Sequence, residues 1–291
     1  GQAGGYTIRG STDNDVIQGG DEVGAGDILL AGELGNDVVI GGNGNDVIQG
    51  GDGIDTLRGD LGADNINGGA GVDLISYATA AATITLALDG SLARAGEALN
   101  DTIALIESIQ GSNFADTLVG DGTANSLLGE GGADILNGKL GNDVLRGGAG
   151  ADNLTGGGVG NDGHQYLALA DLGDIVTDFS SNAAGNNDFF QFRGAVFAGL
   201  AAGVLNAANF VTRADNAAQD VNDFFIFRTT DRSLWFDANG VTARVARFAR
   251  GAVVYSQGGR AGSVFYIQEG GVKLVVLSSA AVYGAWADNP V

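Results

Sequence analysis

Aspartate recurs every nine residues in two stretches of the chain, and this spacing is the most direct hint of chemistry. The first stretch holds Asp46, Asp55, Asp64 and Asp73, and the second keeps the same interval. Carboxylates are ligands for hard cations, and Ca²⁺ accepts about six to eight oxygens in flexible geometry, whereas Mg²⁺ demands a tighter octahedron. Softer metals need Cys or His, but the chain has no Cys and a single histidine, His164. The spacing therefore predicts a series of calcium sites.

Glycine precedes these aspartates in a fixed pattern. The nine-residue unit reads Gly-Gly-x-Gly-x-Asp-x-aliphatic-x, and residues 41–49, 50–58 and 147–155 follow it closely. With small departures, seven units lie within 10–76 and six within 111–165. Glycine adopts positive φ readily and lets backbones approach closely. The first six positions are therefore expected to form a turn.

The last three positions of each unit predict a minimal strand. One aliphatic side chain stands between two outward residues, as in period-two alternation. A strand and a reversal make half a coil, so two units complete one coil of a two-sided solenoid. Strands in a sheet lie about 4.8 Å apart, so stacked aspartates repel unless a cation separates them. The residues expected to be buried are Ile17, Leu29, Val39, Ile48, Leu57, Ile66, Ile75, Leu118, Leu127, Leu136, Leu145 and Leu154.

This template resembles the RTX (repeats-in-toxin) calcium-binding β-roll over residues 10–76 and 111–165. The resemblance implies an all-β fold: a parallel β-roll, or two-sided β-solenoid, of nonapeptide repeats in two blocks, followed by a β-rich C-terminal cap. It also implies several bound Ca²⁺ ions, with a weaker site at Asn125 because an amide brings no charge. The implied turn carbonyls lie near Gly42, Gly44, Gly51, Gly53, Gly69, Gly71, Gly148 and Gly150. The implied aspartate ligands are Asp15, Asp27, Asp37, Asp46, Asp55, Asp64, Asp73, Asp116, Asp134, Asp143, Asp152 and Asp162.

Composition excludes several classes of protein. The 291 residues carry a formal charge of −21, which argues against nucleic acid or an anionic membrane as a partner. Residues 1–165 hold 24 acidic and 5 basic side chains, so the charge lies mainly in the repeats. The absence of Cys excludes disulfides, thiolate nucleophiles and iron–sulfur sites. No apolar run is long enough for a membrane helix. No secretory signal is visible, and without an initiator Met we expect a fragment or a mature piece.

Outside the repeats, the sequence predicts a spacer and a cap. The spacer offers short apolar stretches, such as 83–88 and 103–109. Residues 174–179 and 234–240 are similar to segments that end RTX proteins exported by type I secretion, and we expect His164 to be a surface residue before them. The expected division is a leader at 1–9, a first block at 10–76, a spacer at 77–110, a second block at 111–165, a capping and secretion-type region at 166–247, and a hairpin-like tail at 248–291.

The tail departs from the RTX pattern. Residues 248–279 resemble the opening strands of a cyclic-nucleotide-binding domain, with Ser263-Val264-Phe265-Tyr266-Ile267 and Val272-Lys273-Leu274. The phosphate-binding cassette of that family, with its Gly-Glu pair and arginine, does not follow. We expect a truncated hairpin or a gene-fragment junction, and a cyclic-nucleotide sensor remains an alternative.

The residues favour a binding module rather than an enzyme. No His-Glu-x-x-His, Gly-x-Ser-x-Gly or P-loop motif occurs, and no catalytic constellation is predicted. We predict a secreted, extracellular bacterial calcium-binding module that folds on calcium binding outside the cell. It would be the C-terminal secretion and folding part of a larger RTX protein, with the type I secretion apparatus as its partner during export. The alternatives are the tail of a secreted hydrolase, a protease or lipase, and part of a surface-layer or adhesin protein.

Overall fold

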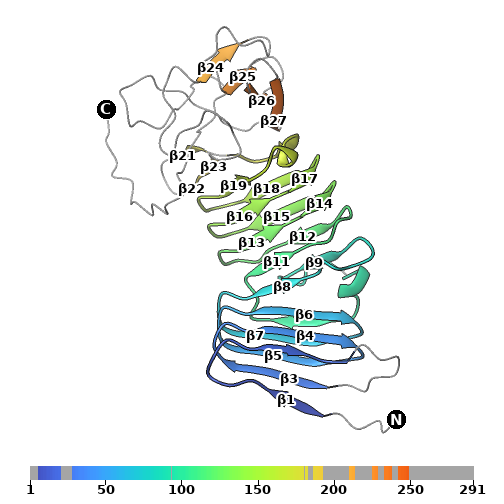
Figure 1. Cartoon of the computed structure of the whole chain (residues 1–291). Helices are drawn as coiled ribbons and strands as arrows, with labels where there is room; N and C mark the ends of the chain where they lie inside the picture. Colours follow the sequence, from blue (N-terminus) through green and yellow to red (C-terminus); the bar gives the residue numbers. More distant parts are fainter. Residues whose placement is uncertain are drawn as a thin grey trace.

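The chain forms a parallel β-solenoid whose coils are stacked along one column (Figure 1). The computed structural model describes residues 6–20, 28–92, 94–179, 181–182 and 186–192, together with strands at 210–213, 225–228, 233–237 and 242–248. The rest, including most of the predicted leader, Asp27 and the tail beyond 248, lies outside the described residues. This architecture confirms the predicted all-β β-roll.

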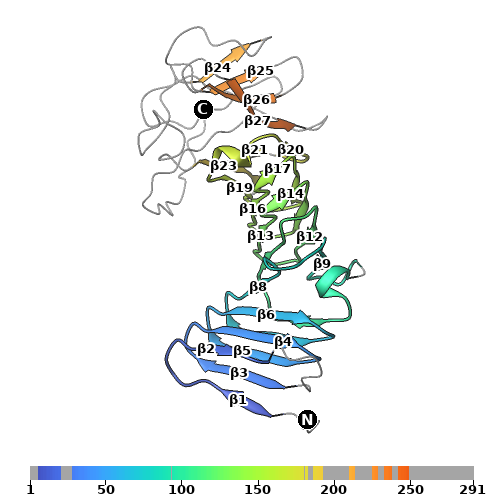
Figure 2. The ribbon, with the colours of Figure 1, turned by 45° about the vertical axis from the view of Figure 1, so that its right-hand side comes forward.

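Two walls of strands face each other along the column (Figure 2). One wall, here called the continuous sheet, runs through both repeat blocks in the order β2 (Val16–Gln18), β4 (Val38–Asn43), β6 (Thr56–Leu61), β8 (Leu74–Ser76), β11 (Ser108–Gln110), β13 (Ser126–Leu128), β16 (Val144–Arg146), β19 (Gly163–Tyr166) and β23 (Phe189–Phe192).

The opposite wall is divided into a lower and an upper sheet. The lower sheet has the order β1 (Thr7–Arg9), β3 (Leu29–Leu34), β5 (Val47–Gly53), β7 (Asn65–Gly71) and β10 (Thr102–Ala104). The upper sheet has the order β9 (Thr85–Ala87), β12 (Thr117–Val119), β15 (Ile135–Lys139), β18 (Asn153–Gly157), β20 (Asp174–Val176), β27 (Thr242–Phe248), β26 (Ser233–Asp237), β25 (Phe225–Arg228) and β24 (Phe210–Arg213). Two short pairs, β14 (Gly131–Gly132) with β17 (Ala149–Gly150) and β21 (Ser181–Asn182) with β22 (Asn186–Asn187), complete the described strands.

The parallel register stacks the aliphatic residues of successive coils into one core. Ile48 lies opposite Ile66, and Leu136 lies opposite Leu154. These side chains have no exposed surface, and each contributes about 1.5–3 kcal/mol by leaving water. One predicted core residue is wrong: Leu30, and not Leu29, is fully buried, because the insertion before it shifts the register by one residue.

The joint, residues 77–107, lies where the solenoid changes direction in Figure 2. From β8 the chain enters β9 at the foot of the upper sheet, turns through the 3₁₀ helix η1 (Gly96–Ala98), and returns to β10 at the head of the lower sheet. Tyr77, Ile84 and Ile106 fill the interior here. The core is therefore one cluster from Ile17 to Phe190, although the lower and upper sheets are separate.

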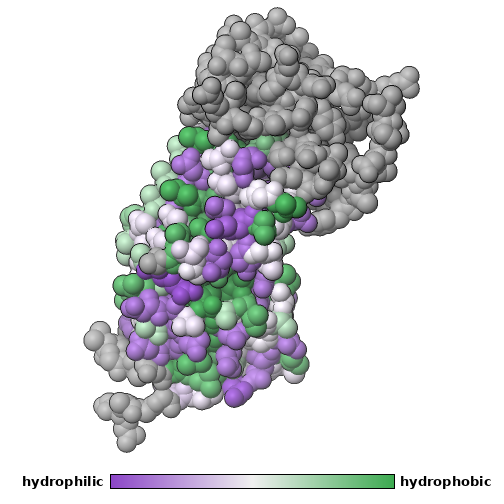
Figure 3. All heavy atoms as spheres, turned by 180° about the vertical axis from the view of Figure 1, so that it is seen from behind, coloured by the Kyte–Doolittle hydropathy of each residue, from purple (hydrophilic) through white to green (hydrophobic). Residues whose placement is uncertain are grey.

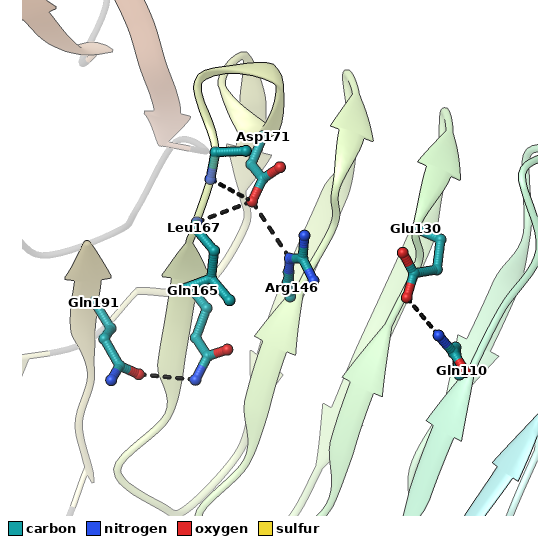
Figure 4. A network of polar contacts seen from close by, with 8 residues as sticks. Gln110, Glu130, Arg146, Gln165, Leu167, Asp171 and Gln191 are labelled. Atoms are coloured by element: carbon teal, nitrogen blue, oxygen red, sulfur yellow. Dashed lines mark hydrogen bonds and ion pairs between the residues drawn. The ribbon is translucent and has the colours of Figure 1, made fainter. Parts of the chain in front are cut away.

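The outer surface mixes polar and apolar residues, as the face in Figure 3 shows. Ile54 and Val159 are exposed aliphatic residues at the turns. On the outside of the continuous sheet, polar side chains bond from strand to strand (Figure 4). Gln165 Nε2 donates to Gln191 Oε1 at 2.8 Å, and Arg146 pairs with Asp171, the last residue of the 3₁₀ helix η2 (Leu169–Asp171). This side of the wall is solvated.

His164 is a correction to the sequence analysis, which placed it on the surface. Its side chain is fully buried, because β19 pairs in register with β16 and places His164 beside Leu145 in the core stack. Its ring centroid lies 6.0 Å from that of Phe179 and 5.7 Å from that of Phe190. Burial lowers the pKa of His164 to about 3, so the imidazole is neutral and serves as a flat core residue.

Candidate metal centre

The turns between strands depend on glycines in the left-handed region. Gly53 has φ +153°, and a Cβ built there would lie 1.6 Å from the carbonyl oxygen of Gly35 in the previous coil. Backbone thus packs directly on backbone, and carbonyl groups of successive turns are brought together. All the predicted turn glycines have positive φ: Gly42, Gly44, Gly51, Gly53, Gly69, Gly71, Gly148 and Gly150.

Four turns place another residue at the second position, where the template has glycine. These residues, Glu33, Asp60, Glu130 and Lys139, keep a positive φ between 65° and 82°. Each side chain has a polar partner, for example Glu130 with Gln110 and Lys139 with an aspartate of the joint. The second position thus requires a left-handed backbone whichever residue occupies it. At these four residues that backbone is strained, because the Cβ crowds the following carbonyl oxygen.

Two ladders of aspartates run along the two edges of the solenoid. The N–H of Asp37 donates to Oδ1 of Asp55 at 2.8 Å, and the N–H of Asp134 donates to Oδ1 of Asp152 at 2.8 Å. The same bond repeats from coil to coil, so each carboxylate holds the turn before it. Ladder 1 contains Asp15, Asp37, Asp55, Asp73 and Glu107, then Asn125, Asp143, Asp162 and Asp188. Ladder 2 contains Asp46, Asp64 and Asp101, then Asp116, Asp134, Asp152 and Asp174.

The second carboxylate oxygen is the feature that points to a cation. In several of these buried side chains Oδ2 is shielded from solvent and has no hydrogen-bond partner within the described part of the chain. It faces the carbonyl of the next coil: a Cβ on Gly32 would lie 2.3 Å from Oδ2 of Asp37 and 2.4 Å from the carbonyl oxygen of Gly50. A buried acceptor without a donor is costly unless a cation or proton meets it. The aspartates concerned, called the open aspartates below, are Asp37, Asp55, Asp64, Asp73, Asp134 and Asp143.

The electrostatics of the ladders oppose ionisation. Burial, together with the neighbouring carboxylates, raises the pKa of Asp64 and of Asp143 to about 7 and that of Asp134 to about 8. The backbone N–H bonds lower these pKa values but do not offset the loss of water. Burial likewise raises the pKa of Asp73 to about 6. Rows of partly ionised, stacked carboxylates therefore need positive charge from outside the protein.

The donor set fits a hard cation. Within the described residues, no three side chains of His, Cys, Asp or Glu gather around one point, so the remaining ligands must be backbone carbonyls. A shell of carboxylate and carbonyl oxygens in flexible turns suits Ca²⁺ and lacks the nitrogen or sulfur that zinc or copper prefers. The residues present thus fit calcium.

The first repeat aspartate of each block differs from the others. Ser11, at the second position of its turn, donates its N–H to Oδ2 of Asp15 at 2.6 Å, and Ser112 does the same for Asp116 at 2.5 Å. Protein donors thus hold these two carboxylates. Asn125, which has the amide in place of a carboxylate, accepts the N–H of Asp121. These three predicted positions offer less to an ion than the open aspartates do.

Four ladder residues lie outside the predicted ligand set: Asp101, Glu107, Asp174 and Asp188. Each accepts the N–H of a ladder aspartate one coil earlier, at distances of 2.9–3.2 Å. All four begin the pattern Asp/Glu-x-apolar-x, either directly before a short strand or, for Asp174, as its first residue; an example is Glu107-Ser108-Ile109-Gln110. A search for the second half of the template, without its glycines, would have found them.

Predicted positions at the start of ladder 2 also differ. The N–H of Ile28 donates to Oδ1 of Asp46 at 3.1 Å, so Ile28 occupies the ladder position expected for Asp27, which itself lies outside the described residues. Of the acids outside the repeat register, Asp13 and Asp52 are exposed and Asp60 pairs with Arg58.

Comparison with known proteins agrees with this geometry. A family model described as RTX calcium-binding nonapeptide repeat (4 copies) matches residues 3–22, 24–57, 40–75, 110–145 and 128–162. The matched ranges end on either side of the joint and stop before β20. A search of curated proteins finds no significant match. In the described part of the chain, no helix has the length and apolar character needed to cross a bilayer.

Proposed function

This chain is an RTX β-roll protein whose repeats bind several calcium ions, and we propose that calcium makes the solenoid fold after the chain has left the cell. Without calcium, stacked carboxylates of ladders 1 and 2 repel one another and keep the chain open. With calcium, the same oxygens become ligands, and binding to the folded state alone contributes its free energy to folding.

The open aspartates are the observation that carries this proposal. Each is buried, and each has an Oδ2 that no donor among the described residues reaches. Burying such groups opposes folding, so the solenoid needs a ligand to balance them. Extracellular calcium modules bind with dissociation constants of about 10⁻⁴–10⁻³ M, which separates a low-calcium cytosol from the medium outside.

The proposed calcium dependence of folding also suits export from the cell. RTX repeat proteins are typically secreted, and an open chain is the form that can pass through a secretion channel. We propose that this chain is the C-terminal secretion and folding part of a larger RTX protein in bacteria, either released or held at the cell surface, with the type I secretion apparatus as its transient partner. The likeness of residues 174–179 and 234–240 to the ends of exported RTX proteins supports this.

The repeats have a structural and not a catalytic role. RTX repeats are a calcium-binding scaffold, and their carboxylates lie at ligand spacing rather than as an acid–base pair. We therefore propose that any catalytic activity of the parent protein, such as that of a secreted hydrolase, is carried by another segment. A surface-layer or adhesin parent would use the same module.

A calcium titration tests the folding proposal. Far-UV circular dichroism should show a cooperative gain of β signal from chelator to about 10 mM calcium, and magnesium at the same concentration should not reproduce it. Asp134→Asn should reduce the stabilisation that calcium adds between chelator and about 10 mM calcium, whereas Asp52→Asn, at an exposed position outside the repeat register, should not. A spectrum that is already β-rich in chelator and indifferent to calcium would refute the proposal.

A further inference from the structure

In the lower block, the last member of ladder 2 is Asp101, a residue of the joint. Oδ1 of Asp101 accepts the N–H of Asp64 at 2.9 Å, the same bond that joins successive repeat aspartates. Asp101 lies 37 residues after Asp64 rather than 18, because the chain passes through β9 and η1 in between. Asp101 thus takes the position of a repeat aspartate without belonging to a repeat.

The second oxygen of Asp101 differs from that of the open aspartates. Its Oδ2 accepts a hydrogen bond from the Tyr77 hydroxyl at 3.1 Å. Tyr77 is 1% exposed and Asp101 is 3% exposed, so this bond is made inside the core. Both carboxylate oxygens of Asp101 therefore have protein donors, and neither is left for an ion.

A positive charge lies beside this carboxylate. Nη1 of Arg94 donates to the backbone carbonyl of Asp101 at 2.8 Å, and Arg94 is the one basic residue in 77–110. Burial raises the pKa of Asp101 to about 6, and the N–H of Asp64, the Tyr77 hydroxyl and the Arg94 guanidinium keep this pKa from rising further. Arg94 thus supplies at the joint the kind of charge that the repeats take from solution.

Above the joint, ladder 2 begins again without a carboxylate from below. The N–H of Ile84 donates to Oδ1 of Asp116 at 2.7 Å, so a buried isoleucine takes the first position. Across the described residues, the lower and upper sheets are not hydrogen-bonded to each other, and only the continuous sheet passes the joint. Along ladder 2, therefore, no carboxylate of the lower block faces one of the upper block.

We propose that Tyr77 and Arg94 do at Asp101 what calcium does in the repeats, so that the joint closes without an ion and divides ladder 2 into two separate calcium series. The joint then keeps its structure when calcium is removed, while the glycine turns on either side open. This inference rests on the proposed calcium-coupled folding of the repeats. It adds that one segment, the joint, folds without calcium.

Hydrogen exchange followed by mass spectrometry separates the two proposals. In chelator, amides in β5 and β15 should exchange freely, while amides whose hydrogen-bond acceptors lie within the joint stay protected: those of Ala80, Thr85, Ala95, Leu99 and Asp101. In calcium, all should be protected. If the joint exchanges as fast as the repeats in chelator, the inference is wrong and calcium-coupled folding stands. If the repeats are also protected in chelator, calcium-coupled folding itself fails.

Substitutions test the roles of the two residues. Tyr77→Phe keeps the ring in the core, and Arg94→Gln removes the charge. Each should speed exchange of the joint in chelator about fivefold to tenfold, the effect of one buried hydrogen bond. Arg58→Gln is the matched control, because Arg58 pairs with Asp60 at a repeat turn and should leave the joint unchanged.

A charge-neutral double variant distinguishes charge balance from packing. If Arg94 balances Asp101, then Asp101→Asn should remove most of the effect of Arg94→Gln on exchange of the joint. If the two effects simply add, Arg94 does not act through Asp101 and the assignment of its role is overturned. Because exchange is compared within one chain, a variant whose repeats have not folded in chelator still reports on the joint.

Discussion

Acid should partly replace calcium in folding this chain. Four of the open aspartates, Asp64, Asp73, Asp134 and Asp143, have raised pKa values, from about 6 for Asp73 to about 8 for Asp134, so the folded state takes up protons that the unfolded chain does not. Stability of the calcium-free chain should therefore rise as the pH falls from about 8, and it should be lost again as the pH rises through the same range.

Asp134 sets the scale of this effect. Its pKa moves from 3.8 to about 8, first through burial and then through the charges of Asp152 and Asp116. Each pKa step of one is worth about 1.4 kcal/mol, so ionised Asp134 costs the calcium-free fold at most about 6 kcal/mol. Asp134 lies at the edge of the solenoid, and solvent beyond the turn still screens part of this charge, which reduces the cost to about 3 kcal/mol. Asp134→Asn should stabilise the calcium-free chain at neutral pH by that amount.

Far-UV circular dichroism in metal-stripped buffer, from about pH 8 to about pH 5.5, follows the gain of folded chain, and urea denaturation at the acidic pH values where the chain folds measures its stability. The range stays above the isoelectric point near 4.1, and size-exclusion chromatography at each pH excludes aggregation as the source of β signal. In saturating calcium the slope should reverse, because ligand carboxylates must be ionised to bind the ion. A calcium-free stability that is flat or falls with acid would show that these carboxylates are not buried in the folded chain.

Three further substitutions test the turns and the core. Gly53→Ala places a Cβ 1.6 Å from a carbonyl oxygen of the previous coil and should cost about 2 kcal/mol or more in calcium, whereas Gly122→Ala, with nothing within 4 Å, should be nearly neutral by the same denaturation curve. Leu136→Ala, at a fully buried position, should lower the free energy of unfolding by about 2–5 kcal/mol, and exposed Leu140→Ala by far less. Lys139→Gly relieves a side chain at φ +82° and should raise the melting temperature, with a gain of about 0.5–1 kcal/mol; a loss would mean that its exposed ion pair matters more than the backbone strain.

Much of the repeat geometry could be predicted because nine residues form both the sequence unit and the structural unit. At the second and fourth positions of the unit a Cβ would clash with the backbone of the previous turn, as at Gly51 and Gly53, so glycine recurs there. The aliphatic residue at the eighth position faces the core in the coils without insertions, because each coil repeats the same register. A pattern that repeats this often identifies its own buried face.

The remaining features depend on contacts that have no fixed spacing in the sequence. Asp101 and Glu107 join the ladders across 37 and 34 residues, distances set by the path of the joint. His164 is buried by Phe190, which reaches it through the pairing of β19 with β23. Leu30 replaces Leu29 because an insertion changes the register without changing the composition. In each case the stacking of coils determines which residues meet, and the local sequence pattern does not predict that stacking.

The ladder bonds all point the same way, and this makes the two ends of any stack chemically different. The first acid of a stack cannot take its ladder bond from an earlier acid, and Asp46 and Asp116 take it from Ile28 and Ile84. The last aspartate of a repeat block needs an acceptor outside the repeats, as Asp64 has in Asp101. At Asp15, the first acid of ladder 1, Ser11 donates its N–H to Oδ2. A shortened or recombined array therefore needs a backbone donor before its first aspartate and a trailing carboxylate after its last repeat, as Asp101 and Glu107 provide for the lower block.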